Sequence, residues 1–312
     1  MNQLARREFL VTGSAAGAAL ALAHSMPKLL QAEPANRAIG IQLYTVAADL
    51  AADARGTLTA LASIGYREVE SAGFAKLSAG DFRKALDDAE LHCPSAHLHF
   101  SAADPGPLFE DAHAVGAHYA VSSVLIAMPE TPSGTPPKRE DFIKALANLT
   151  LDDFKRTADL ANTIGAKAKQ AGLQYAYHNH NFEFKDQGNG QTGYDLLLSQ
   201  TDPDLVKFEL DCGWMVTAGH DPIDYFRKYP NRYRMIHVKD FLPGGKPSTS
   251  LSGPDRPQGT ELGRGHIDYA PIFSAASQAG VEYFFSEQEP PIEGMTAIEA
   301  AKVNYDYMRS LK

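Results

Sequence analysis

The feature that most limits how this chain can fold is a repeated alternation of strand-like and helix-like segments through residues 38–312. Each short apolar run is followed by a longer stretch whose apolar residues recur at helical spacing. Eight such pairs occupy roughly 275 residues, and a barrel of eight parallel strands with outer helices takes about 250. The sequence therefore predicts an α/β protein with a single (β/α)8 barrel domain over residues 38–312.

No break in composition marks a second domain within that range. The predicted strands are 38–44, 66–70, 95–100, 118–126, 173–180, 205–211, 233–239 and 281–287. The predicted helices are 50–63, 79–91, 108–115, 141–171, 194–199, 222–228, 269–279 and 296–309. The longest helix has weak points near Thr150 and Gly165. Asp221 and Asp268 are expected to cap the helices that follow them.

The main rival fold is a doubly wound open sheet, which uses the same alternation. That fold usually carries a glycine-rich nucleotide-binding turn after its first strand. Here Tyr44-Thr45-Val46 follows the first strand, and no G-x-G-x-x-G pattern is present there. The barrel is therefore the favoured fold.

The N-terminus reads as a targeting segment. Arg6 and Arg7 precede a short, weakly apolar run, residues 11–23, which fits a twin-arginine signal peptide over residues 1–32. Cleavage after Ser25 and cleavage after Ala32 both fit. The run is too short to span a bilayer. We expect export, to the periplasm or beyond the membrane, and rank a basic cytosolic tail well below it.

Charge and cysteine content exclude some classes of partner. The net charge is -9 and no basic stripe is present, so nucleic acid is not expected to be the main partner. The two cysteines, Cys93 and Cys212, are placed at opposite ends of the predicted barrel. That separation exceeds the roughly 7 Å that a disulfide allows between Cα atoms, so two free thiols are predicted.

Polar residues gather where the predicted strands end, and the strand starts show no such enrichment. In a (β/α)8 barrel these ends form the functional face. Imidazoles and carboxylates together are ligands for divalent metals. The residues at these ends are Gln42, Tyr44, Glu70, His97, His99, His178, His180, Glu183, Glu209, Asp211, His237, Lys239, Asp240, Glu287 and Glu289.

Each of these residues also has a purely structural interpretation. Glu70 could be an ordinary polar strand end, and His97 could be a hydrogen-bonded core histidine. Asp211 could cap the turn that follows it. Their shared location makes a joint metal and substrate site the better interpretation.

Five stretches resemble the xylose isomerase-like TIM-barrel superfamily of sugar isomerases and epimerases, which also includes inosose dehydratases and endonuclease IV-type AP endonucleases. The stretches are 65–70, 177–180, 209–211, 236–240 and 285–287. The resemblance covers the chain after the signal segment. It implies a divalent ion (Mn, Co, Zn or Mg) held by His178, Asp211, His237 and Glu287.

One position departs from the family pattern. Many members have Glu-Asn-His where this chain has His178-Asn179-His180. Either His178 replaces the carboxylate as a ligand, or Glu183 reaches the ion from the following loop. In the isomerases the carboxylates of the fifth and eighth strands act as a proton-shuttling pair, and here one of them is missing.

The resemblance implies a metal-dependent sugar isomerase or epimerase that removes a proton beside a carbonyl through an enediolate. Glu287, Glu183 and His180 are the candidate catalytic residues. The small-molecule partner is a sugar, with no membrane contact in the mature form, and the oligomeric state is left open. The candidate substrate-binding residues are Glu70, His97, His99, Trp214, Lys239, Asp240 and Arg264.

Three other functions compete with this one. A lyase or dehydratase acting on a keto-sugar or keto-glycoside would use the same metal site, and the His-for-Glu change at position 178 favours it. An AP endonuclease shares the fold, but the acidic charge and the signal segment count against it. A non-catalytic periplasmic sugar- or metal-binding protein is the fourth hypothesis.

Overall fold

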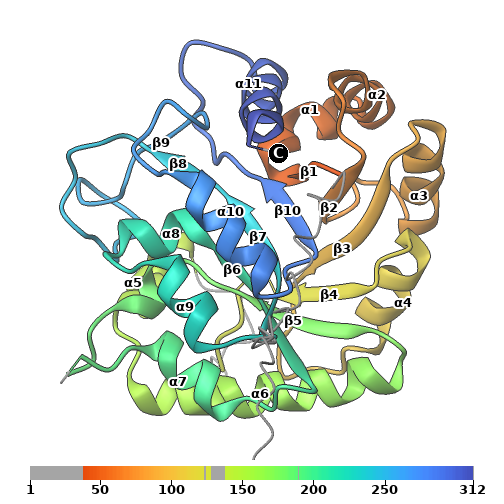
Figure 1. Cartoon of the computed structure of the whole chain (residues 1–312). Coiled ribbons are helices and arrows are strands. Elements are labelled where there is room, and N and C mark those ends of the chain that lie inside the picture. Colours follow the sequence, from red (N-terminus) through yellow and green to blue (C-terminus); the bar gives the residue numbers. More distant parts are fainter. Residues whose placement is uncertain (1–37, 123, 128–137, 189, 312) are drawn as a thin grey trace, which may run out of the picture. The chain divides into compact units, whose positions relative to one another are not determined.

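Eight parallel strands close into a barrel in the computed structural model, which describes residues 38–122, 124–127, 138–188 and 190–311 (Figure 1). Around the barrel the order is β1-β10-β7-β6-β5-β4-β3-β2. This arrangement confirms the predicted (β/α)8 TIM barrel. The strands are β1 (Gly40–Gln42), β2 (Glu68–Ala72), β3 (His92–Leu98), β4 (Tyr119–Ser122), β5 (Gln174–His178), β6 (Val206–Asp211), β7 (Tyr233–Val238) and β10 (Tyr283–Ser286).

Helices follow the strands along the chain and surround the barrel (Figure 1). The α-helices are α1 (Ala47–Ala52), α2 (Ala54–Ile64), α3 (Ala79–Asp88), α4 (Gly106–Val115), α5 (Arg139–Ala147), α6 (Leu151–Gln170), α7 (Gly193–Gln200), α8 (Cys212–Thr217), α9 (Pro222–Lys228), α10 (Tyr269–Gln278) and α11 (Ala297–Ser310). Two 3-10 turns, η1 (Leu43–Val46) and η2 (Phe182–Phe184), follow β1 and β5. A small antiparallel pair joins β8 (Asp240–Phe241) to β9 (Gly259–Thr260).

Side-chain caps set several helix boundaries. Asp221 and Asp268 cap α9 and α10, as predicted. The predicted helix 141–171 is two helices, because Thr150 forms a capping box with Asp153 at the start of α6. In the same way Asp53 caps α2 and divides the predicted helix 50–63. A side chain that accepts a backbone N–H favours a new helix start over continuation of the old one.

Gly165 does not weaken α6, contrary to the prediction. A Cβ atom at this position would lie 2.6 Å from the carbonyl oxygen of Leu205, just before β6. The glycine therefore allows α6 to pack closely against the barrel wall, and close packing outweighs its low helix propensity.

The barrel wall separates two apolar cores. The larger core lies between the strands and the helices. The smaller one, which we call the plug, consists of Tyr119, Val121, Ala176, Met235 and Phe285. These residues alternate along their strands with members of the outer core, so they face the barrel interior. The plug closes the barrel beneath the polar strand ends.

Several predictions concern other parts of the chain. The predicted signal segment, 1–32, lies outside the described residues, as do residues 128–137 of the loop after β4. Among the described helices, none has the length and apolar content needed to cross a bilayer. Cys93 and Cys212 are both buried free thiols, which confirms that prediction.

Candidate active site

Acidic and imidazole side chains from different strands converge above the plug. Ala176, Met235 and Phe285 of the plug stand two residues before polar members of this set, so the period of two along each strand places them on one side of the wall. All of the set are buried or nearly so. The converging residues are Glu70, His97, His178, Glu209, Asp211, His237 and Glu287.

The imidazole of His237 stands between four carboxylates. Its Nε2 atom lies 2.7 Å from Glu70 Oε1 and 3.2 Å from Glu209 Oε2. Its Nδ1 atom lies 2.8 Å from Glu287 Oε2 and 3.8 Å from Asp211 Oδ2. The two ring nitrogens therefore face two different sets of ligand atoms.

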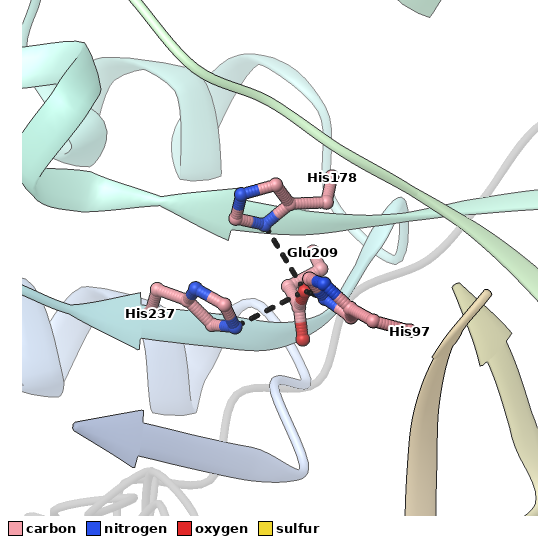
Figure 2. A group of neighbouring side chains, drawn as sticks. All are labelled: His97, His178, Glu209 and His237. Atoms are coloured by element: carbon pink, nitrogen blue, oxygen red, sulfur yellow. Dashed lines mark hydrogen bonds and ion pairs between the residues drawn. The ribbon is translucent and has the colours of Figure 1, made fainter. Parts of the chain in front are cut away.

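These sets define two groups that share His237, and each has its ligand atoms within 4.8 Å of one another. The upper group is Asp211, His237 and Glu287. The lower group is His97, His178, Glu209 and His237 (Figure 2). Asp211 ends β6 and Glu209 stands two residues before it, so the upper group lies nearer the barrel mouth. The upper group contains three of the four metal ligands expected from the resemblance, and His178 belongs to the lower group.

In the lower group, three imidazoles point at one carboxylate oxygen, Glu209 Oε2 (Figure 2). The distances are 2.7 Å from His97 Nε2, 3.1 Å from His178 Nδ1 and 3.2 Å from His237 Nε2. The other oxygen, Glu209 Oε1, is buried and has no hydrogen-bond partner within the described ranges. This group is therefore rich in imidazole and almost fully buried.

In the upper group a lysine ammonium joins the carboxylates. Lys239 Nζ lies 3.0 Å from Asp211 Oδ2, 3.0 Å from Glu287 Oε2 and 2.8 Å from Glu289 Oε1. Asp211 also uses its Oδ1 atom to accept the backbone N–H of Trp214, which caps α8. The capping role considered from the sequence is therefore confirmed for Asp211, and the other oxygen of the same carboxylate faces the upper group.

The mouth of the site lies beside Glu289. Its Oε1 atom accepts the indole N–H of Trp214 at 3.1 Å, and its Oε2 atom lies 2.7 Å from Arg256 Nη2. A cavity of about 70 Å³ borders Trp214, Lys239, Arg256 and Glu289. That volume is enough for one or two water molecules. A larger hollow of about 1070 Å³ is lined by Phe182, Phe241 and the 243–258 loop, and none of the converging residues borders it.

The end of β5 supplies a neutral acid and a neutral base. Burial raises the pKa of Glu183 to about 8 and lowers the pKa of His180 to about 4. Glu183 accepts the hydroxyl of Tyr177 and the backbone N–H of His180. The Nδ1 atom of His180 is buried and has no hydrogen-bond partner in the described part of the chain. His180 lies beyond the strand, because β5 ends at His178 rather than at residue 180 as predicted.

The carboxylates control the charge of the neighbouring imidazoles. Burial opposes a charge on His97, but Glu70 and Glu209 outweigh it and raise the pKa of His97 to about 9. Burial likewise opposes a charge on His237, and Glu209 and Glu287 raise its pKa well above the usual range. For His178, burial and the charge on His237 lower the pKa. The buried carboxylates therefore favour a positive charge on His97 and His237, whereas His178 is favoured as the neutral imidazole.

The donor atoms fit a divalent ion. Buried carboxylate oxygens and imidazole nitrogens are the usual ligands of Mn, Co and Zn ions. Glu209 Oε1, in the lower group, is a buried acceptor without a hydrogen-bond partner among the described residues, whereas Asp211 Oδ2, in the upper group, faces the ammonium of Lys239. A His, Asp and Glu cluster in this barrel could therefore hold a metal ion.

The sequence of residues 58–311 matches the family described as xylose isomerase-like TIM barrel. The chain belongs to the xylose isomerase-like TIM barrel family. This result and the closed barrel agree with the resemblance found at the strand ends.

Relatives of this xylose isomerase-like barrel carry out several reactions. Inosose dehydratase of Lacticaseibacillus casei is 32% identical over 155 residues, which cover 46% of this chain and 50% of that protein. The chain thus spans about half the length of this relative. Inosose dehydratase of Geobacillus thermodenitrificans is 29% identical over 251 residues, covering 72% of this chain and 82% of that one. A sugar phosphate isomerase/epimerase of Parabacteroides distasonis superposes with a TM-score of 0.66 at 25% identity, covering 89% and 96% of the chains. Dehydratases and isomerases among the relatives support the prediction of an enzyme.

In this xylose isomerase-like barrel, other residues expected to bind substrate lie at different depths. Glu70 is fully buried, where it accepts bonds from Gln42 Nε2 and Ser95 Oγ and holds His237. His99 is exposed beyond β3. Trp214 is 1% exposed, and its ring centroid lies 4.9 Å from that of Phe241.

Asp240 and Arg264 belong to the loop between β7 and α10. The carboxylate of Asp240 accepts five backbone N–H groups, which leaves it as the anchor of that loop. Arg264 is half-exposed and pairs with Glu261 at 3.1 Å. Both residues are thus engaged by their own loop.

Two residues of the site were given no individual role from the sequence. Glu209 was noted among the polar strand ends but not among the metal ligands, although it stands two residues before Asp211 and strand periodicity places it on the same side. Arg256 lies in the long loop after β7, and only the folded loop brings it to Glu289. No sequence pattern marks that contact.

Proposed function

We propose that this protein is a metal-dependent lyase that removes water, or another leaving group, from a sugar or cyclic polyol bearing a ketone. The observation that carries the proposal is that β5 and β10 present different kinds of acid–base group to the site. β10 leads into the carboxylate Glu287, whereas β5 ends in the imidazole His178, which contacts Glu209. Isomerisation by two equivalent carboxylates lacks its second member here, but elimination needs one base and one acid.

The upper group would hold the ion, through Asp211, His237 Nδ1 and Glu287. A divalent ion there would polarise the ketone and a neighbouring hydroxyl and stabilise the negative charge that develops when a proton leaves. Glu183 and His178 were the predicted choices for a fourth ligand. The contacts of Glu183 with Tyr177 and His180, and of His178 with Glu209, argue for leaving that position to the substrate.

His180 is the proposed base. It is neutral at pH 7, its Nδ1 atom has no partner in the described part of the chain, and its ring lies 6.3 Å from that of Trp214. Glu287 is also unprotonated, but Lys239 and His237 overcome its burial and lower its pKa further, so it is the weaker base. Proton transfer is most efficient when the pKa of the base approaches the working pH.

The remaining groups complete the elimination. The α-proton moves to Nδ1 of His180, and the electron pair of that C–H bond becomes the C=C bond as the β-hydroxyl leaves. Protonated Glu183, which accepts the N–H of His180, supplies a proton so that the hydroxyl departs as water. The ammonium of Lys239 faces the negative charge on the substrate oxygen.

An NMR experiment in D2O tests the proposal. Protein loaded with Mn²⁺ is incubated with an inosose, with a 3-keto-glycoside and with a free ketose. We expect olefinic signals of a dehydrated ring or release of the aglycone. Deuterium exchange with a rearranged ketose would instead support an isomerase, and absence of any product would remove the enzymatic proposal.

The isomerase or epimerase remains the second candidate. It is favoured by the similarity to the Parabacteroides distasonis protein, which extends over 89% of this chain. In that case Glu287 and Glu183 would exchange protons across the substrate carbon. Glu183→Gln would then abolish exchange of the substrate C–H with D2O, whereas a lyase that uses His180 as base would retain it.

We also propose export through the twin-arginine pathway. Arg6 and Arg7, followed by a short apolar run, support this proposal. Replacing both by lysine should leave the protein in the cytoplasm, as cell fractionation would show. Unchanged distribution would overturn the proposal.

A further inference from the structure

We propose that His97, His178 and Glu209, with Nε2 of His237, bind a second divalent transition-metal ion beneath the upper group. This lower ion does not depend on the proposed chemistry. His97, His178 and Glu209 have no part in the proposed reaction, and the ligands come from β3, β5, β6 and β7.

The distances within the lower group match those around a single ion. Zinc binds imidazole nitrogen at about 2.0–2.1 Å, so ligand atoms on one ion stand roughly 3.3 Å apart. The three imidazole nitrogens lie 2.7, 3.1 and 3.2 Å from Glu209 Oε2. Small movements of the side chains would open a position at their centre, where the three rings of Figure 2 converge.

Glu209 gives an independent sign of a missing partner. Its Oε1 atom is buried and has no hydrogen-bond partner within the described ranges. A buried carboxylate oxygen without a partner carries a substantial desolvation cost. An ion at the centre of the group, bound through both oxygens of Glu209, would meet that demand.

The surroundings of the lower group suit an ion because carboxylates flank it and apolar side chains bury it. Glu70 Oε1 lies 3.0 Å from His97 Nε2 and 2.7 Å from His237 Nε2, so a second carboxylate flanks the same nitrogens. Two carboxylates balance one dication without a further anion. Ala176 and Met235 of the plug stand two residues before His178 and His237, and they shield the position from water below.

The two groups should prefer different metals. The lower group offers three imidazoles and a carboxylate, which suit Zn²⁺ or Co²⁺. The upper group offers two carboxylates and one imidazole, which suit Mn²⁺ or Mg²⁺ more nearly. The opposite nitrogens of His237 connect the two positions, and when both ions are bound the ring would release its remaining N–H proton to solvent and bridge them as an imidazolate.

Metal counting tests the second site. Protein stripped of metal with a chelator is titrated with Co²⁺, and bound cobalt is measured by elemental analysis and by visible absorption. The variants are His97→Asn for the lower group and Asp211→Asn for the upper group. His118→Asn is the matched control, because His118 is exposed and its ring packs on Tyr119. Circular dichroism checks that each variant is folded, and His178→Asn replaces His97→Asn if that variant is not.

We expect two Co²⁺ per chain in the parent protein and in His118→Asn, and one in each of the other variants. A single Co²⁺ that Asp211→Asn loses and His97→Asn retains would overturn the second site and leave the proposed function intact. A single Co²⁺ with the reverse dependence would support the lower site and overturn the upper ion on which the proposed function rests. Absence of bound Co²⁺ in the parent protein would overturn both.

Discussion

The upper and lower groups share one histidine but differ in what surrounds them. The lower group is rich in imidazole and rests on the apolar plug, and its carboxylate Glu209 pairs with histidines rather than with a lysine or arginine of the described residues. The upper group is rich in carboxylate and carries the ammonium of Lys239 and a small cavity at the mouth. The comparison indicates that the lower position suits a permanently held ion. The upper position suits an ion that could also bind a substrate entering from the mouth.

Removing His237 should have the largest effect, since it breaks both groups at once. His237→Asn leaves Glu70, Glu209 and Glu287 buried without their shared cationic partner. We expect the free energy of unfolding to fall by about 3–5 kcal/mol, as it does when one member of a buried charged pair is removed. Urea denaturation measures the change, with exposed His118→Asn as the control. A loss below about 1 kcal/mol would mean that the groups are not coupled through this ring.

Substitution of His180 should lower the catalytic rate while leaving the stability of the protein nearly unchanged. His180→Gln removes the proposed base, and a positioned base contributes about 10²–10⁴-fold to rate. We expect kcat to fall by that factor, while bound metal and the free energy of unfolding stay nearly constant. Steady-state kinetics with an inosose and a urea titration give the two readouts. Unchanged kcat would return the base role to Glu287.

The pH dependence of stability tests the burial of Glu183. Burial raises its pKa to about 8, so the folded state keeps a proton that the unfolded state releases above its ordinary pKa of about 4.5. The contribution of this proton to stability is therefore complete below about pH 4.5 and is lost as the pH rises toward 8. Each pKa unit corresponds to about 1.4 kcal/mol, so the rise from 4.5 to about 8 corresponds to a decline of about 5 kcal/mol. Glu183→Gln should flatten the curve obtained from urea titrations at several pH values, and an unchanged slope would contradict the prediction.

The smallest effect is expected at the exposed edge of the mouth. Arg264 pairs with Glu261 while its own side chain is half-exposed, and exposed ion pairs contribute about 0–1 kcal/mol. Arg264→Ala should therefore lower the free energy of unfolding by less than about 1 kcal/mol, as measured by thermal unfolding. A larger loss would show that the loop after β7 stabilises the barrel more than its contacts indicate.

Strand ends were predictable because their signal is local. The alternation of strands and helices, and the run of acids and histidines at residues 178, 211, 237 and 287, are visible without any long-range contact. Caps at Asp221 and Asp268 were predictable for the same reason. The division of the 141–171 helix was visible only as a weak point, because helix periodicity continues on both sides of Thr150.

What the sequence determined by itself was the barrel and the face that carries its site, since periodicity and turn chemistry act over a few residues. What only the tertiary structure decided was which ligand atoms meet. His178 lies with Glu209 rather than with Asp211 and Glu287, Glu70 supports His237 from beneath, and Lys239 stands among three carboxylates. The physical reason is that strand periodicity fixes only the side of the wall a residue faces. The stagger of eight strands around a closed barrel fixes the height at which side chains meet, and that height separates the two groups.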